Sequence, residues 1–164
     1  MGKLSRDMRR ACSLQAMVFE ASVTNSDSGS AVFVRRFMLS DVARRFDSGF
    51  VPIEPQDAGA LVREVEGQYG NKVYGSARYT ANELHWMGYV YRAWSCMLDM
   101  PSKTVYRQIG AADLRACYGP YHTLDVEQAV ARIREDRNLN NDVLSIEYGV
   151  KVMRRIRELE EDGC

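Results

Sequence analysis

The apolar side chains of this chain recur at intervals of three and four residues, and the strict alternation typical of half-exposed strands is scarce. That spacing matches the turn of an α-helix and predicts an all-α fold. Polar stretches rich in turn and cap formers interrupt the pattern at Thr24–Ser30 and at 138–141. We therefore expect one compact multi-helix domain over 1–164, with an N-terminal helix over 1–25, a core over 31–137 and a C-terminal helix over 141–161.

The segment 82–99 is the most strongly apolar helix that the pattern predicts. Thr80 and Glu83 form a capping box ahead of it, in which the threonine oxygen accepts from the glutamate backbone and the carboxylate reaches back. Pro101 requires the helix to end near Asp99. On a helical wheel two adjoining apolar seams cover well over half of the circumference: Leu84, Met87, Tyr91, Trp94 and Leu98 in one, and Trp86, Val90, Ala93 and Met97 in the other. A helix with so wide an apolar surface is expected at the centre of the domain.

A polar stripe remains on this aromatic-rich helix. His85, Tyr89 and Arg92 follow one another at spacings of four and three residues, so one face carries all three. One interpretation is a half-exposed edge on which the tyrosine and the arginine extend to water. The other is a concave aromatic surface that binds a protein partner, since Tyr and Arg anchor many interfaces. Under this hypothesis the site comprises His85, Tyr89, Arg92, Tyr106, Tyr118, Tyr121 and His122.

Residues that bear catalytic or metal-binding chemistry are few. The chain has two histidines, His85 and His122, and neither has further ligands at a spacing that holds a metal ion. Glycine-rich phosphate loops are also absent. From these two observations we expect no metal and no cofactor. We expect His122 to bond a backbone carbonyl within its turn. The alternative is a small enzyme that uses His122 as an acid or base.

The cysteines and the apolar runs bear on the compartment. Cys12, Cys96, Cys117 and Cys164 form no C-x-x-C motif. The basic N-terminal stretch lacks the apolar region of a signal peptide, and no apolar run is long enough to cross a bilayer. We therefore expect a cytoplasmic protein with free thiols and no membrane contact, in which Cys96 is a small buried hydrophobe.

The charge pattern gives little support to nucleic-acid binding. The net charge is zero, and the arginine pairs at 9–10, 35–36 and 44–45 are expected on solvated helix faces or in a patch for an acidic partner. In a helix–turn–helix over 103–118, Tyr106 occupies a position that needs a small residue. Arg115 is the only basic side chain of its second helix. A DNA-binding transcription regulator stays an alternative. The charged end of the 141–161 helix is a candidate homodimer surface.

Two stretches resemble a group of small bacterial proteins. "FVRRFMLSDVARRFD" is similar to the group's N-terminal part. "YTANELHWMGYVYRAWSCMLDMPSKTVYRQIGAADLRACYGPYHTLDVEQAVARI" carries its aromatic-rich helix, its Ser-Lys-x-Val-Tyr piece and its Pro-Tyr-His-Thr-Leu turn. The resemblance covers roughly 31–133. Members of the group are similar to antitoxin or accessory components of two-gene toxin–antitoxin modules. The resemblance implies a non-enzymatic protein-binding module whose partner is a toxin-like protein encoded beside it.

Overall fold

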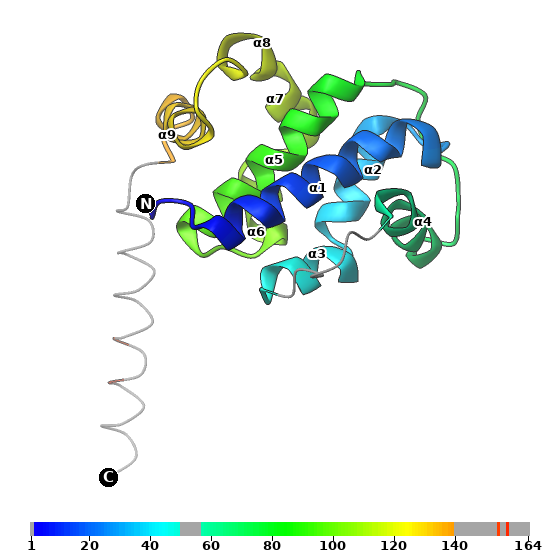
Figure 1. Ribbon diagram of the computed structural model, residues 1–164, viewed down its shortest axis with the longest axis horizontal. Helices are drawn as coiled ribbons and strands as arrows, with labels where there is room; N and C mark the ends of the chain where they lie inside the picture. The colour runs from blue at the N-terminus through cyan, green and yellow to red at the C-terminus, as the bar shows by residue number, and fades with distance from the viewer. Residues whose placement is uncertain (1, 50–56, 140–153, 155–156, 158–164) are drawn as a thin grey trace. The chain divides into compact units, whose positions relative to one another are not determined.

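The structure is a computed structural model that describes residues 2–49 and 57–139 together with Arg154 and Arg157. Within these residues every regular element is a helix (Figure 1), which confirms the all-α prediction. Apart from Arg154 and Arg157, which are helical, the predicted helix over 141–161 and its candidate dimer surface lie outside the described residues.

The chain divides into two compact units, which are described separately. Unit 1 comprises residues 1–130 and unit 2 comprises residues 131–164. The helices of unit 1 are α1 (Arg6–Asn25), α2 (Ser30–Met38), α3 (Asp41–Asp47), α4 (Ala58–Gln68), α5 (Ala81–Leu98), α6 (Ser102–Gln108), α7 (Ala111–Ala116) and α8 (Tyr118–Tyr121). Helix α9 (Val126–Asp136) begins in unit 1 and ends in unit 2.

Helix α5 begins at the predicted capping box. Thr80 Oγ1 accepts from the Glu83 N–H at 3.1 Å, and Glu83 Oε1 accepts from the Thr80 N–H at 3.1 Å. These two bonds satisfy backbone donors that the first turn of a helix leaves without partners. The helix ends where Asp99 adopts a left-handed conformation with φ 49°. The predicted bounds of 82–99 therefore agree with the structure to within one residue at each end.

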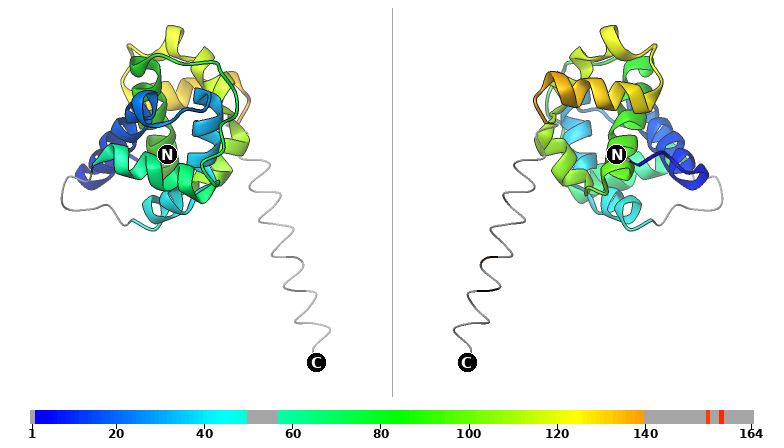
Figure 2. Two further views of the ribbon diagram at one scale, coloured as in Figure 1. Left: turned by 90° about the vertical axis from the view of Figure 1, so that its right-hand side faces the viewer. Right: turned by 90° about the vertical axis from the view of Figure 1, so that its left-hand side faces the viewer.

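Helices α1 and α5 lie side by side and run in opposite directions (Figures 1 and 2). Near one end of the pair, the Gly2 N–H donates to the Met97 carbonyl at 3.1 Å. Near the other end, His85 Nδ1 lies 2.9 Å from Glu20 Oε2. The two helices are therefore antiparallel: residues early in α1 lie beside residues late in α5, and residues late in α1 lie beside residues early in α5.

The aromatic core of unit 1 forms where α5 meets α1 and α2. Several side chains of α5 have no exposed surface: Leu84, Met87, Val90, Tyr91 and Trp94. Phe19 of α1 meets Phe33 and Phe37 of α2 nearly edge-on, with ring centroids 5.9 and 5.0 Å apart. The Tyr91 ring lies 6.2 Å from Phe19. The predicted central position of the aromatic-rich helix is therefore confirmed.

Gly88→Ala is expected to destabilise the fold, because the added Cβ would lie 2.8 Å from the Gln15 carbonyl oxygen and 2.9 Å from the Ala16 Cα. Backbone atoms of a neighbouring helix cannot turn aside as the tip of a side chain can, so α1 and α5 must separate. We expect the free energy of unfolding, measured by urea denaturation, to fall by about 1–3 kcal/mol.

Gly67→Ala in α4 is the matched control, because a Cβ at Gly67 meets nothing within 4 Å. Alanine has the higher helix propensity, so this variant is expected to gain up to about 1 kcal/mol of stability. Equal stabilities of the two variants would contradict the close approach of α1 and α5 at Gly88.

Candidate functional site

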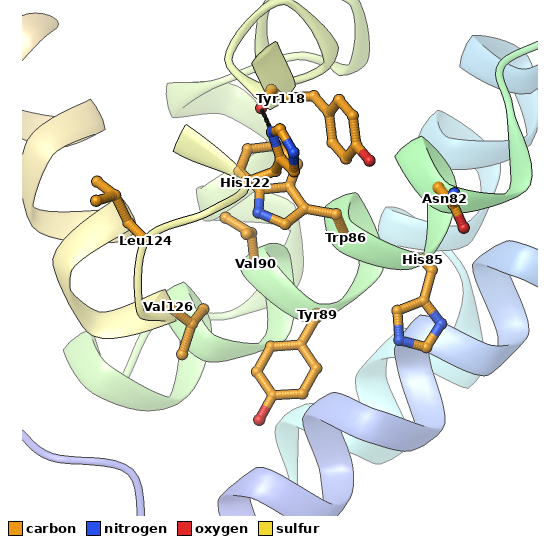
Figure 3. Close-up of a pocket in the computed structure, with 9 residues that line it drawn as sticks. All are labelled: Asn82, His85, Trp86, Tyr89, Val90, Tyr118, His122, Leu124 and Val126. Carbon is orange, nitrogen blue, oxygen red and sulfur yellow. Dashed lines mark hydrogen bonds between the residues drawn. The ribbon is translucent and has the colours of Figure 1, made fainter. Parts of the chain in front are cut away.

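An open cavity of about 280 Å³ lies between the first half of α5 and the segment that runs from α8 to the start of α9 (Figure 3). We call it the aromatic cavity. Its lining residues are Asn82, His85, Trp86, Tyr89, Val90, Tyr118, His122, Leu124 and Val126. All of them belong to unit 1, so the cavity is formed within one compact body.

Three aromatic side chains of the lining, Trp86, Tyr118 and His122, pack against one another. The Trp86 and Tyr118 rings meet edge to face, with centroids 5.7 Å apart and an interplanar angle of 81°. The His122 ring is stacked on Tyr118, at 4.4 Å and 16°. Residues 118 and 122 are four apart on a helical turn, which places their side chains on the same side. Figure 3 shows these rings on one side of the cavity and Tyr89 on the other.

The tautomer of His122 follows from its hydrogen bonds. Nδ1 lies 2.7 Å from the Tyr118 carbonyl oxygen and 3.2 Å from that of Gly119. A carbonyl oxygen only accepts, so Nδ1 carries the proton, and Nε2 of the neutral ring is an acceptor. The predicted bond between His122 and a backbone carbonyl in its turn is confirmed. The imidazole is exposed and lines the cavity instead of being enclosed within the turn.

The rim of the aromatic cavity is polar. His85 is exposed and is paired with Glu20 of α1. Burial raises the pKa of the Tyr89 phenol, with Cys12 acting in the same direction and a hydrogen bond from Arg9 opposing both. Tyr89 therefore keeps its proton at neutral pH and offers both a donor and an acceptor.

Arg92 does not share this rim, and the prediction that it extends from the same exposed face is wrong. Its side chain is 1% exposed, and its guanidinium is enclosed by groups from three other helices. Nε donates to Gln15 at 2.7 Å, Nη1 to Asp47 at 2.8 Å and Nη2 to Ser102 at 2.7 Å. The face of α5 that is open at His85 is covered two turns later by α3 and α6. A helical wheel does not represent that change along the axis.

The structure brings together four of the seven predicted site residues: His85, Tyr89, Tyr118 and His122. Tyr106 lies on α6, where its half-buried ring is 6.4 Å from the buried Tyr91, and it does not line the aromatic cavity. Tyr121 is half-buried on α8 and is also absent from the lining.

Sequence reasoning missed most of the apolar part of the lining. The helical wheel assigns Trp86 and Val90 to a core seam, but Trp86 is only half-buried, and its ring meets Tyr118 of α8. Leu124 is 37% exposed, between the polar residues Thr123 and Asp125. A large apolar side chain in a polar turn is the signal that marks this position.

The lining of the aromatic cavity consists of aromatic, aliphatic and amide side chains. The cavity contains no carboxylate, thiol or aliphatic hydroxyl. Over the described ranges, no group of His, Cys, Asp and Glu residues is arranged to hold a metal ion. In that part of the chain no helix has the length and apolar character needed to cross a membrane.

The candidate helix–turn–helix has no free base-reading arginine in its second helix. Its second helix corresponds to α7, whose six residues are extended by the single turn of α8. Arg115 Nε donates to Glu83 Oε2 at 2.8 Å, and its guanidinium lies 4.3 Å from the centre of the Tyr79 ring. The only basic side chain of this second helix is therefore already engaged on the protein surface.

No protein-family model matches this sequence, and the comparisons with curated proteins and with solved structures found no match.

Arg92→Ala is expected to be strongly destabilising, because it leaves the carboxylate of Asp47, which is only 17% exposed, without its cation. Removal of one partner from a buried ion pair costs about 3–5 kcal/mol. Urea unfolding followed by tryptophan fluorescence measures the loss.

Arg44→Ala is the matched control for this variant. Arg44 pairs with Asp41 at 2.9 Å, but the two side chains are 75% and 66% exposed. Exposed pairs contribute less than about 1 kcal/mol, so the control should stay close to the wild type. If Arg92→Ala is no more costly than Arg44→Ala, the arginine is not the structural residue described above.

Proposed function

We propose that this protein is a non-enzymatic protein-binding module that acts in the cytoplasm as the antitoxin or accessory member of a two-gene toxin–antitoxin module. The aromatic cavity is the observation that carries the proposal: an open, ring-lined hollow with a polar rim and no catalytic pair of side chains. The sequence resemblance over 31–133 supplies the class of partner, a toxin-like protein encoded by the adjoining gene.

The size of the cavity supports a partner side chain as its occupant. Small-molecule and cofactor sites typically enclose about 300–1,000 Å³ and cover most of their ligand. This cavity is about 280 Å³ and open. A hollow of that kind suits one or two side chains that project from a partner protein, with the rest of the partner resting on the surrounding surface.

The side chains of the lining are those that anchor protein interfaces. Aromatic rings offer a large apolar area with few rotatable bonds, and little conformational entropy is lost when a partner binds them. Trp86 and Tyr118 are already fixed against each other by their edge-to-face contact. His122 Nε2 and the Tyr89 hydroxyl then provide directional hydrogen bonds beside the aliphatic lining residues Val90, Leu124 and Val126.

The two alternatives receive less support. A small enzyme would use Nε2 of His122 as a general base, yet the only other histidine of the lining, His85, is bonded to Glu20 outside it. A transcription regulator would need Arg115 to leave Glu83 and Tyr79 before it could reach a base. A salt-sensitive shift of operator DNA by the purified protein would favour that alternative over the proposal.

The first experiment tests the class of function. The gene that adjoins this one is expressed alone and together with it, and growth is measured. We expect the adjoining gene product to arrest growth when expressed alone, to be harmless in the presence of this protein, and to copurify with it. An adjoining product that is harmless on its own, or that does not bind, would sink the antitoxin assignment.

The second experiment tests the location of the interface with Tyr89→Ala and His122→Ala. Loss of an anchoring residue typically costs more than about 1.4 kcal/mol of binding energy, so the Kd for the adjoining gene product should rise roughly tenfold or more in each variant. Calorimetry gives the Kd, and circular dichroism checks that both variants remain folded.

Tyr74→Ala is the control for these variants. Tyr74 is also a tyrosine and is 58% exposed, but it lies outside the aromatic cavity. Its replacement should leave the Kd unchanged. A folded Tyr89→Ala variant that binds as tightly as Tyr74→Ala would show that the partner rests elsewhere on the surface.

A further inference from the structure

Two cysteines that are distant in sequence meet between α1 and α5. Cys12 lies on α1 and Cys96 lies in the last turns of α5. The antiparallel arrangement places them in register, because Gln15 and Arg92, each one turn nearer the middle of its helix, are already bonded at 2.7 Å. This register brings the two thiols close enough for each to shift the pKa of the other.

The two thiols differ sharply in access to solvent. Cys12 has no exposed surface. Cys96 is half-buried, so its prediction as a buried hydrophobe is wrong, and it lines a second cavity of about 280 Å³ together with Met8, Asp47, Arg92, Asp99 and Met100 among others. A small reagent that enters this cavity therefore meets Cys96, whereas Cys12 does not line the cavity.

The charges around the pair favour a thiolate at Cys96. The neighbouring Cys12 thiol and the positive charge of Arg92 lower the pKa of Cys96 to about 7, against the opposing effects of burial and of Asp47. The neighbouring Cys96 and burial raise the pKa of Cys12, although Arg92 and Arg9 act the other way. Cys12 is therefore the proton donor of the pair, and Cys96 is the nucleophile.

We propose that Cys12 and Cys96 form a redox site, in which a hydroperoxide oxidises Cys96 and Cys12 then closes an intramolecular disulfide between α1 and α5. Cys96, at the cavity, meets the oxidant, and Cys12, held behind it in the core, is the resolving residue. This inference goes beyond the proposed function and does not depend on it.

The chemistry balances in two steps. The Cys96 thiolate attacks one oxygen of the hydroperoxide, the O–O bond breaks, and the other oxygen leaves as an alcohol or water after taking a proton from solvent. Cys96 is then a sulfenic acid. The Cys12 sulfur attacks the Cys96 sulfur, the S–O bond breaks, and the hydroxyl leaves as water with the Cys12 proton. The two sulfurs together give up two electrons, which reduce the peroxide.

The first test treats the full chain with graded hydrogen peroxide, blocks the remaining thiols with N-ethylmaleimide and maps the peptides by mass spectrometry. We expect a pair of peptides joined through Cys12 and Cys96, lighter by two hydrogen atoms and separated by dithiothreitol. Sulfinic acid at Cys96 without a cross-link, or disulfides that join other cysteines in its place, would overturn the proposal.

Variants separate the roles of the two thiols. Cys117→Ser combined with Cys164→Ser leaves only the proposed pair and should form the disulfide at the wild-type rate. Cys12→Ser should accumulate a sulfenic acid at Cys96 that dimedone labels, because the resolving thiol is missing. Cys96→Ser should consume peroxide roughly tenfold more slowly, as expected when the ionised thiol is lost. Wild-type peroxide consumption by a folded Cys96→Ser variant would exclude Cys96 as the nucleophile.

A measurement on the wild-type chain does not depend on how well these variants fold. The rate at which iodoacetamide alkylates Cys96 is followed against pH in the native protein and in urea. The native rate should be half-maximal near pH 7. In the unfolded chain the rate should be half-maximal at the pKa of an ordinary thiol, about 8.5. Coincident profiles would show that the native pair does not activate Cys96, and the proposal would fail.

Discussion

The buried guanidinium of Arg92 is the interaction on which the arrangement of unit 1 depends. A cation removed from water is stable only if its donors all find acceptors, and here the acceptors come from different helices. Helix α1 contributes the acceptor Gln15, α3 contributes Asp47, and the start of α6 contributes Ser102. Asp47 also accepts from the Ser102 N–H at 3.1 Å, so one carboxylate serves both the arginine and the first turn of α6. Displacement of any one of these helices leaves a donor of the buried guanidinium without its acceptor, which fixes their positions more narrowly than apolar contact does.

A second buried pair acts in the same way at the far side of α1. Arg36 of α2 pairs with Glu66 of α4, and both side chains are at most 10% exposed. Ser26, which ends α1, donates to the free oxygen of Glu66 at 3.0 Å. The aromatic rings between these two networks tolerate small shifts, because dispersion contacts have no strict direction. The ion pairs do not tolerate such shifts, because an unsatisfied buried charge is costly. We infer that the apolar core supplies most of the driving force for folding, while Arg92 and Arg36 select one arrangement of the helices.

The features that sequence reasoning predicted are those that depend on a few neighbouring residues. The capping box at Thr80 and Glu83 is local, and so is the turn in which His122 bonds the Tyr118 carbonyl. The wheel placed Trp94 correctly in the core because its face of α5 is covered along the whole helix. Arg92 and Cys96 were misplaced for the opposite reason. Their surroundings come from α1, α3 and α6, and no spacing along 82–99 reveals which half of a face those helices cover. The aromatic cavity is predicted only in part. Its polar and aromatic residues can be identified on the separate segments, but its apolar lining depends on how α5 and α8 pack together.

The aromatic cavity and the cysteine pair lie at opposite ends of α5, and α1 connects them. Glu20 of α1 holds His85 at the rim of the aromatic cavity, while Cys12, two turns earlier on α1, meets Cys96. Closure of a disulfide requires the two sulfurs to approach to about 2 Å. Gly88 lies between these points with α1 backbone already against it, so α1 has no room to move straight toward α5 there. The approach at Cys96 must therefore be taken up away from Gly88, by the two side chains and by the ends of the two helices.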